Sequence, residues 1–167
     1  DPNKTNLWGQ TALLYCLTRK KIARLLLDAG ADPNRGDRPS TNPLWQAVGQ
    51  QLLSTVRWLL DAGATPNLVC SDYDLMDRQI SPGTTLLMYV AATGRVRIIP
   101  LLLRAGADPT PVNDDGQTAL QLALINKQPS IAEMLLPSSG ALGDSERGLL
   151  AIAQLIEGAK TGKPKLV

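Results

Sequence analysis

The chain has 167 residues, of which 44% are hydrophobic and 19% charged, and its formal net charge is +2. This length supports one domain with a sizeable core, and the near balance of charge does not favour nucleic acid or an anionic membrane as a partner. No apolar run reaches the roughly 18 residues of a membrane span, and the first residues show no signal-peptide pattern.

In chain order, one phrase returns at a step near 33 residues. The chain opens on "DPN", and the phrase is "LLLDAGADPN" at 25–34, "WLLDAGATPN" at 58–67 and "LLLRAGADPT" at 101–110. A second phrase stands ahead of each helix pair: "GQTALLYCL" from Gly9, "STNPLWQAV" from Ser40, "GTTLLMYVA" from Gly83 and "GQTALQLAL" from Gly116. Such a period indicates stacked repeats. We therefore predict repeats over about 9–34, 40–67, 83–110 and 116–137, with the opening "DPN" as the tail of an earlier one.

Each repeat holds two short stretches with apolar residues at helical spacing. In the last repeat these are Leu120, Ala123 and Leu124, then Ile131, Met134 and Leu135. Helices of roughly eight to ten residues are not stable alone in water, so each must bury its apolar stripe against neighbours. Glycines follow the second helices at the position where a left-handed residue ends a helix: Gly30, Gly63 and Gly106.

These phrases resemble the ankyrin repeat, in which a Gly-x-Thr-Pro-Leu-His-like helix opening is followed by a leucine run and a Gly-Ala-Asp turn. The resemblance covers residues 1–137 and recurs in phase at four sites. It implies an all-α solenoid of antiparallel helix pairs joined by β-hairpin fingers. It also implies a module that binds a folded partner protein on the fingers and first helices.

The chain departs from the family pattern in three ways. It has no histidine, and the usual histidine position holds Leu14, Trp45, Met88 and Gln121, so any network built on that residue is absent or rebuilt. The first repeat is about two residues short between its helices. Pro100 falls inside the expected second helix of the third repeat, where we expect it to remove a hydrogen bond and bend the helix.

The segment before Gly83 is ten residues longer than its counterparts. Residues 68–82 occupy an interval of fifteen, whereas 4–8, 35–39 and 111–115 hold five each. Surface insertions cost little stability, so a tolerated loop is the plain interpretation. The apolar and charged residues interleaved in it favour instead a contact with a partner, or burial of the loop on its own solenoid.

Residues 138–160 are expected to form a loop and a C-terminal capping helix, which would cover the end of the stack, followed by a disordered tail at 161–167. Because the chain does not begin with Met, we expect it to be processed or trimmed. Its compartment stays open: cytoplasmic by default, or periplasmic or secreted if an N-terminal segment has been removed.

The sequence offers no sign of an enzyme. Without histidine, Ser-His and Cys-His pairs and histidine-ligated metals are impossible. Cys16 and Cys70 lie too far apart for a metal-ligand motif. Residues 158–163, "GAKTGK", are too short for a phosphate-binding loop, and residues 72–77, "DYDLMD", lack the calcium-loop spacing. We therefore expect no catalytic residue, metal, cofactor or small-molecule substrate.

Candidate partner-binding residues follow from the positions that the family exposes. Trp8 is the most informative, because Trp is enriched in binding hot spots; packing on the stack or on an earlier repeat is its alternative. Trp45 and Trp58 fall at helix positions and are predicted to be core. The candidates on the fingers and first helices are Leu7, Trp8, Gln10, Thr18, Arg19, Arg38, Thr41, Gln50, Thr84, Thr93, Asp114, Asp115, Gln117 and Asn126. Those on the long finger are Tyr73, Asp74, Leu75, Met76 and Arg78.

The sequence thus predicts non-catalytic recognition of another protein. The wording of the repeats resembles bacterial members of the family, some of which are immunity or inhibitor proteins that occlude an enzyme. The alternatives are a structural segment of a larger polypeptide and a secreted effector that acts on host proteins. The partner and the oligomeric state are not determined by these residues.

Overall fold

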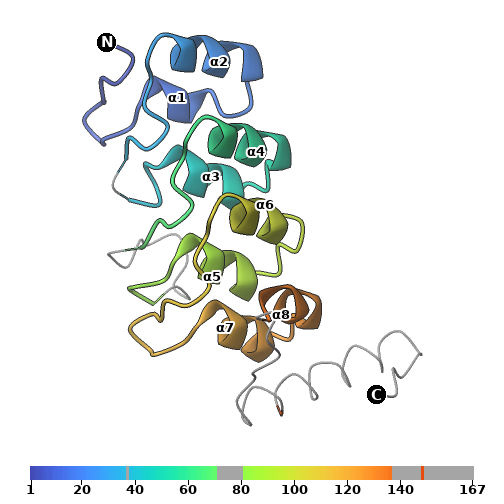
Figure 1. The fold of residues 1–167 in the computed structure, drawn as a ribbon. Coiled ribbons are helices and arrows are strands. Elements are labelled where there is room, and N and C mark those ends of the chain that lie inside the picture. Colours follow the sequence, from blue (N-terminus) through green and yellow to red (C-terminus); the bar gives the residue numbers. More distant parts are fainter. Residues whose placement is uncertain (37, 71–80, 137–147, 149–167) are drawn as a thin grey trace.

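A computed structural model of the chain describes residues 1–36, 38–70, 81–136 and 148. The helices of this part form four pairs: α1 (Ala12–Tyr15) with α2 (Lys20–Asp28), α3 (Pro43–Gly49) with α4 (Leu53–Asp61), α5 (Leu86–Ala92) with α6 (Ile99–Arg104), and α7 (Ala119–Ile125) with α8 (Pro129–Leu135). The pairs stack in chain order, so that α1, α3, α5 and α7 form one row and α2, α4, α6 and α8 a second row (Figure 1). The predicted all-α solenoid is confirmed.

Fingers project from the N-terminal ends of the first-row helices (Figure 1). We call residues 4–11, 35–41, 68–85 and 111–118 the first to fourth fingers. Their β pairing within the described residues consists of two isolated antiparallel bridges, Thr5 with Thr11 and Val69 with Thr85. The fingers are therefore tight turns rather than regular ribbons.

The first-row helices begin at side-chain caps. Thr118 Oγ1 accepts from Gln121 N–H (3.2 Å), and Gln121 Oε1 accepts in return from Thr118 N–H (2.9 Å). Thr85 and Met88 make the same reciprocal cap, with the Met88 sulfur as acceptor (3.4 Å). Such caps satisfy backbone donors that the helix itself leaves unpaired. The network at the missing histidine is thus rebuilt with a glutamine and a methionine.

The second-row helices α2, α4 and α6 end at glycine, as predicted. Gly63, which follows α4, has φ +90°, and Ala64 N–H beyond it donates to Leu59 O (2.9 Å). This is the turn in which a left-handed residue lets the chain satisfy the last helical carbonyls. Gly30 and Gly106 end α2 and α6 in the same way.

Successive turns are tied together by the asparagine of each "DPN" phrase. Asn34 Nδ2 donates to Gly63 O (3.0 Å), and Asn34 Oδ1 accepts from Thr65 N–H (2.7 Å). The same two bonds join Asn3 to Gly30 and Asp32, and Asn67 to Gly106 and Asp108. This asparagine clasp therefore links each second-row helix end to the turn of the preceding pair.

Thr110 stands where the next clasp asparagine would be. It bonds only within its own turn, where its N–H and its hydroxyl both donate to Asp108 Oδ1 (2.9 and 2.7 Å). These two bonds, the backbone one first, hold the pKa of Asp108 below its ordinary value, because they stabilise the charged carboxylate.

We predict that Asn34→Ala lowers the free energy of unfolding by about 1 kcal/mol, since it removes two hydrogen bonds between pairs whose partners remain open to water. Urea unfolding followed by circular dichroism would measure the loss. Thr110→Ala is the matched control, because it truncates the equivalent position without breaking a clasp. Equal losses in the two variants would contradict a role for the clasp in joining the pairs.

The core runs between the two rows without interruption. Helix α5 is its centre, since all its residues from Leu86 to Ala91 are buried. Trp45 of α3 stacks on Tyr89 of α5 with ring centroids 5.7 Å apart, and the guanidinium of Arg95 lies over the Tyr89 ring at 4.6 Å. Arg95 also donates to Gly49 O (3.1 Å), which ties the α5–α6 loop to the end of α3. The prediction that Trp45 is core is confirmed, whereas Trp58 is only half-buried.

The prediction for Pro100 was wrong. Helix α6 begins at Ile99, so Pro100 occupies its first turn, where no N–H is needed and the fixed φ favours a helix start. The helix is six residues long, against nine in α2 and α4. Proline therefore shortens the helix instead of bending it.

The shortness of the first pair is confirmed. The caps of its two helices, Thr11 and Arg19, are 19 − 11 = 8 residues apart, whereas Asn42 and Leu52 of the second pair are 52 − 42 = 10 apart. Helix α1 has accordingly only four residues. The predicted C-terminal loop, helix and tail lie outside the described residues except for Gly148, which is helical.

Candidate functional site: the finger surface

The first finger is a tight turn held by Asn6. Asn6 Oδ1 accepts from the N–H groups of Trp8 (2.9 Å) and Gln10 (3.0 Å), and Gly9 N–H closes the turn on Asn6 O (3.1 Å). Gly9 has φ +75°, which a side chain would disfavour. The asparagine and the glycine thus fix the backbone, and the side chains of Leu7 and Trp8 take no part in it.

The fourth finger has the same construction. Asn113 Oδ1 accepts from Gln117 N–H (2.8 Å), and Gly116 N–H donates to Asn113 O (2.8 Å). The two segments are "NLWGQT" at 6–11 and "NDDGQT" at 113–118, so they differ only in the two residues at the tip. One backbone therefore carries Leu-Trp in the first finger and Asp-Asp in the fourth.

The Leu-Trp tip is open to solvent. Leu7 is 98% exposed and Trp8 74% exposed. Of the two alternatives to partner contact, packing of Trp8 on its own stack is contradicted by this exposure. Isolated apolar side chains on a surface are common, but two adjacent ones at the end of a projecting turn form a patch that needs an explanation.

A concave surface of about 610 Å³ adjoins this tip between the first and second fingers. Four predicted site residues meet there: Leu7, Trp8, Gln10 and Arg38. Thr41 also lines it, yet its side chain is buried, and its hydroxyl donates to Arg38 O (3.2 Å). The tip of the first finger and the arginine of the second thus face one space.

The remaining candidates fall into different surroundings. Thr84 is only 4% exposed, so its place in the predicted contact surface was wrong: the base of the third finger covers it. Asp115 accepts from the Ser81 hydroxyl, which packs the fourth finger against the third. Three candidates share one register at the C-terminal caps of first-row helices, and Arg19 is the N-terminal cap of α2: these three are Gln50, Thr93 and Asn126.

The base of the third finger is well ordered by pairing. Cys70 N–H donates to Thr84 O (2.8 Å), Gly83 N–H to Cys70 O (3.0 Å) and Leu86 N–H to Leu68 O (2.9 Å). The insertion is therefore held at both ends by the fold. Residues 71–80, with the candidates Tyr73, Asp74, Leu75, Met76 and Arg78, lie outside the described residues.

Other chemistry is sparse in the described part of the chain. Cys16 and Cys70 are both free thiols there. No group of three or more histidine, cysteine, aspartate or glutamate residues gathers among these residues in a way that could hold a metal ion. None of the helices found in them is long and apolar enough to cross a bilayer.

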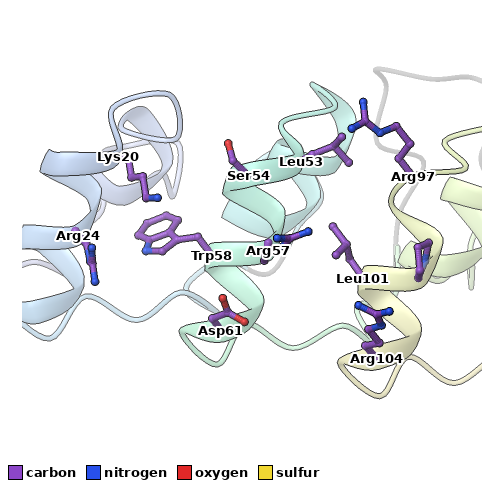
Figure 2. A pocket seen from close by; sticks show the side chains of 11 residues that line it. Lys20, Arg24, Leu53, Ser54, Arg57, Trp58, Asp61, Arg97, Leu101 and Arg104 are labelled. Atoms are coloured by element: carbon purple, nitrogen blue, oxygen red, sulfur yellow. The ribbon is translucent and has the colours of Figure 1, made fainter.

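Two exposed features escaped prediction. Tyr15 is 65% exposed and donates its hydroxyl to Gln10, which enlarges the surface of the first finger. A basic groove crosses α2, α4 and α6 on the second row (Figure 2). The available signal for the groove was the 33-residue step from Arg24 to Arg57, which places both at one helical position.

Comparison with known proteins agrees with the repeat pattern. A family model described as ankyrin repeats, with three copies, matches residues 1–70 and 67–146. The chain is 31% identical over 114 residues to glycerophosphocholine phosphodiesterase gde1 of Schizosaccharomyces pombe, covering 68% of this chain and 9% of that protein. It is 30% identical to neurogenic locus notch homolog protein 1 of Xenopus tropicalis over 139 residues and of Homo sapiens over 146, covering 82% and 86% of this chain.

The chain spans only 5% of the length of either notch protein, so these matches concern the repeats and not the activities of the whole relatives. The phosphodiesterase match is equally partial. The family model, in contrast, covers well over half of the chain. The chain therefore belongs to the ankyrin-repeat family, a family of protein–protein interaction modules.

Proposed function

We propose that this chain is a non-catalytic recognition module that binds a folded partner protein through the first and second fingers. The observation that carries the proposal is the pair of identical turns with different tips. Because Asn6 and Gly9 already define the backbone, nothing in the fold requires Leu7 and Trp8 to be apolar. Their exposure costs solubility, and Trp is the residue most enriched at binding hot spots.

The surroundings of the tip suit an interface. Arg38 of the second finger borders the same concave space, and Arg is also enriched at hot spots. An apolar anchor beside a charged and polar rim is the usual anatomy of a protein contact. The rigid stack behind the fingers lowers the entropy lost on binding.

Binding of this kind would inhibit a partner whose active site receives the tip. The projecting Leu-Trp pair would fill an apolar depression, and the stack would cover its mouth, as in an immunity or inhibitor protein. Resemblance in wording to bacterial members of the family supports this finer assignment. A secreted effector would use the same surface on a host protein, whereas a structural segment of a larger polypeptide would not need it.

The decisive variant exchanges one tip for the other. Leu7→Asp with Trp8→Asp gives the first finger the sequence that the fourth finger already folds, so the turn should persist. The immobilised chain would first capture a partner from the source lysate. After identification and purification, that partner would be titrated against both forms by calorimetry. We expect the exchange to weaken binding by about 2 kcal/mol or more, roughly thirtyfold, as for loss of a hot spot.

Leu25→Asp is the matched control, because it places the same charge on an exposed apolar residue of the second row. Unchanged affinity with the control and lost affinity with the exchange would support the proposal. Equal affinity of all three forms would move the interface away from these fingers. A partner enzyme whose activity falls with the intact chain alone would support inhibition, and failure to capture any partner would favour the structural segment.

A further inference from the structure

The second row carries a surface of different chemistry. A groove of about 650 Å³ runs across α2, α4 and α6 (Figure 2). It lies on the helices of the second row, whereas the fingers project from the ends of the first row (Figure 1). A ligand in the groove and a partner on the finger tips can therefore be bound together.

Positive charge dominates the groove. Five cationic side chains line it and one carboxylate, that of Asp61: the cations are Lys20, Arg24, Arg57, Arg97 and Arg104. All five are exposed, and the structure records no ion pair for any of them within the described part of the chain. Since the whole chain carries only +2, this is a local concentration of charge. Its field favours an anionic ligand.

The floor of the groove is apolar. Leu53, Trp58 and Leu101 line it and are half-buried. Figure 2 shows the indole of Trp58 directed from α4 toward α2, where Lys20 and Arg24 lie. An aromatic face beside cationic groups offers apolar contact at the centre and charge at the edges, so the ligand should carry an apolar group among its anionic ones.

We propose that this groove binds an acidic peptide segment in extended conformation, with glutamates or aspartates on the arginines and an apolar side chain over Trp58. Helices packed at about 10 Å place the three helices across about 20 Å, which an extended peptide spans with about six residues. Arginine guanidiniums hold carboxylates through paired, charge-assisted hydrogen bonds.

Asp61 distinguishes this peptide from a nucleic acid. A peptide presents backbone N–H donors to a carboxylate, whereas a phosphate backbone presents only negative oxygens and would be repelled. The groove also has a single aromatic side chain, and single strands are usually held by successive stacking platforms. The observations therefore favour peptide as the occupant.

The test uses the whole chain and a defined probe, a fluorescein-labelled peptide of about ten residues with glutamates around a central leucine. Fluorescence anisotropy would compare the native chain with Arg57→Gln/Arg104→Gln, and with Lys4→Gln/Lys127→Gln, which removes two charges outside the groove. We expect the groove variant to bind at least about tenfold more weakly, as loss of charge-assisted bonds predicts, and the control to bind normally. A peptide with glutamine in place of glutamate should not bind.

Nuclear magnetic resonance supplies a second readout. On addition of the peptide, the indole N–H signal of Trp58 should shift while that of Trp8 stays in place; Trp58→Leu assigns it. Equal weakening in both charge variants, or a shift of Trp8 alone, would overturn the groove as the site. Tighter binding of oligo-deoxythymidine than of the peptide would overturn the choice of occupant.

Discussion

Gly36→Ala should lower the free energy of unfolding by about 3 kcal/mol, the combined cost of a disfavoured backbone and a steric clash. Gly36 has φ +123°, a region that residues with side chains rarely adopt. An added Cβ would lie 2.4 Å from the Thr41 carbonyl oxygen, which is backbone and is held within the second finger. Urea unfolding followed by circular dichroism would give the change.

Gly30→Ala separates the two causes. Gly30 also has a positive φ, +86°, but an added Cβ would meet nothing within 4 Å. That variant should therefore cost only the left-handed strain, about 1 kcal/mol. If both variants lost the same amount, the close approach at Gly36 would contribute nothing.

The second finger also links this prediction to recognition. Gly36 precedes Arg38 by two residues, and Asn42 Nδ2 donates to Gly36 O (3.4 Å). Relief of the clash must therefore shift the segment that places Arg38 beside the first finger. A folded Gly36→Ala variant should consequently bind the finger partner less well than Gly30→Ala does.

The fold was predictable because its determinants are local and repeated. Gly30, Gly63 and Gly106 mark helix ends by backbone conformation alone, and the leucine runs before them set the buried stripe. One such phrase would leave the architecture open. Three copies in phase exclude most alternatives, because each helix needs a neighbour of the same shape.

The errors arose where a residue's effect depends on its exact register. Pro100 lies where α2 and α4 are already helical, but the turn of α6 starts later, so the proline became a starting residue. Thr84 occupies a finger position, but the base of the long third finger buries it. Neither outcome follows from the repeat pattern, since both depend on how the third pair departs from the others.

The candidate site was predictable only in part. Exposed finger tips follow from the repeat, so Leu7 and Trp8 could be named. The meeting of Gln10 with Arg38 needed the stacking of two pairs, and the groove needed three helices in space. Arg97 and Arg104 carry no repeat signal, because their counterparts elsewhere in the chain are different residue types.

Leu59→Ala should also cost about 3 kcal/mol, within the range for truncation of a buried leucine. Leu59 lies in α4 and is fully buried, at 0% exposure, between the neighbouring pairs. The substitution removes apolar contacts and leaves a cavity that rigid helices on both sides cannot close. Thermal or urea unfolding would measure it, with Leu25→Ala, an exposed neighbour in α2, as a variant expected to change little.

Leu26 supplies the informative comparison, because it stands 33 residues before Leu59 at the same place in α2. Leu26 is only half-buried and packs at the edge of the core. Its truncation should therefore cost about half as much, since less apolar surface is lost and solvent can enter the space. Stability in a stack is a sum over neighbouring units, so identical residues differ by the number of faces that are covered. Equal losses at Leu26 and Leu59 would mean that each pair is stable by itself, and the solenoid would then not depend on stacking.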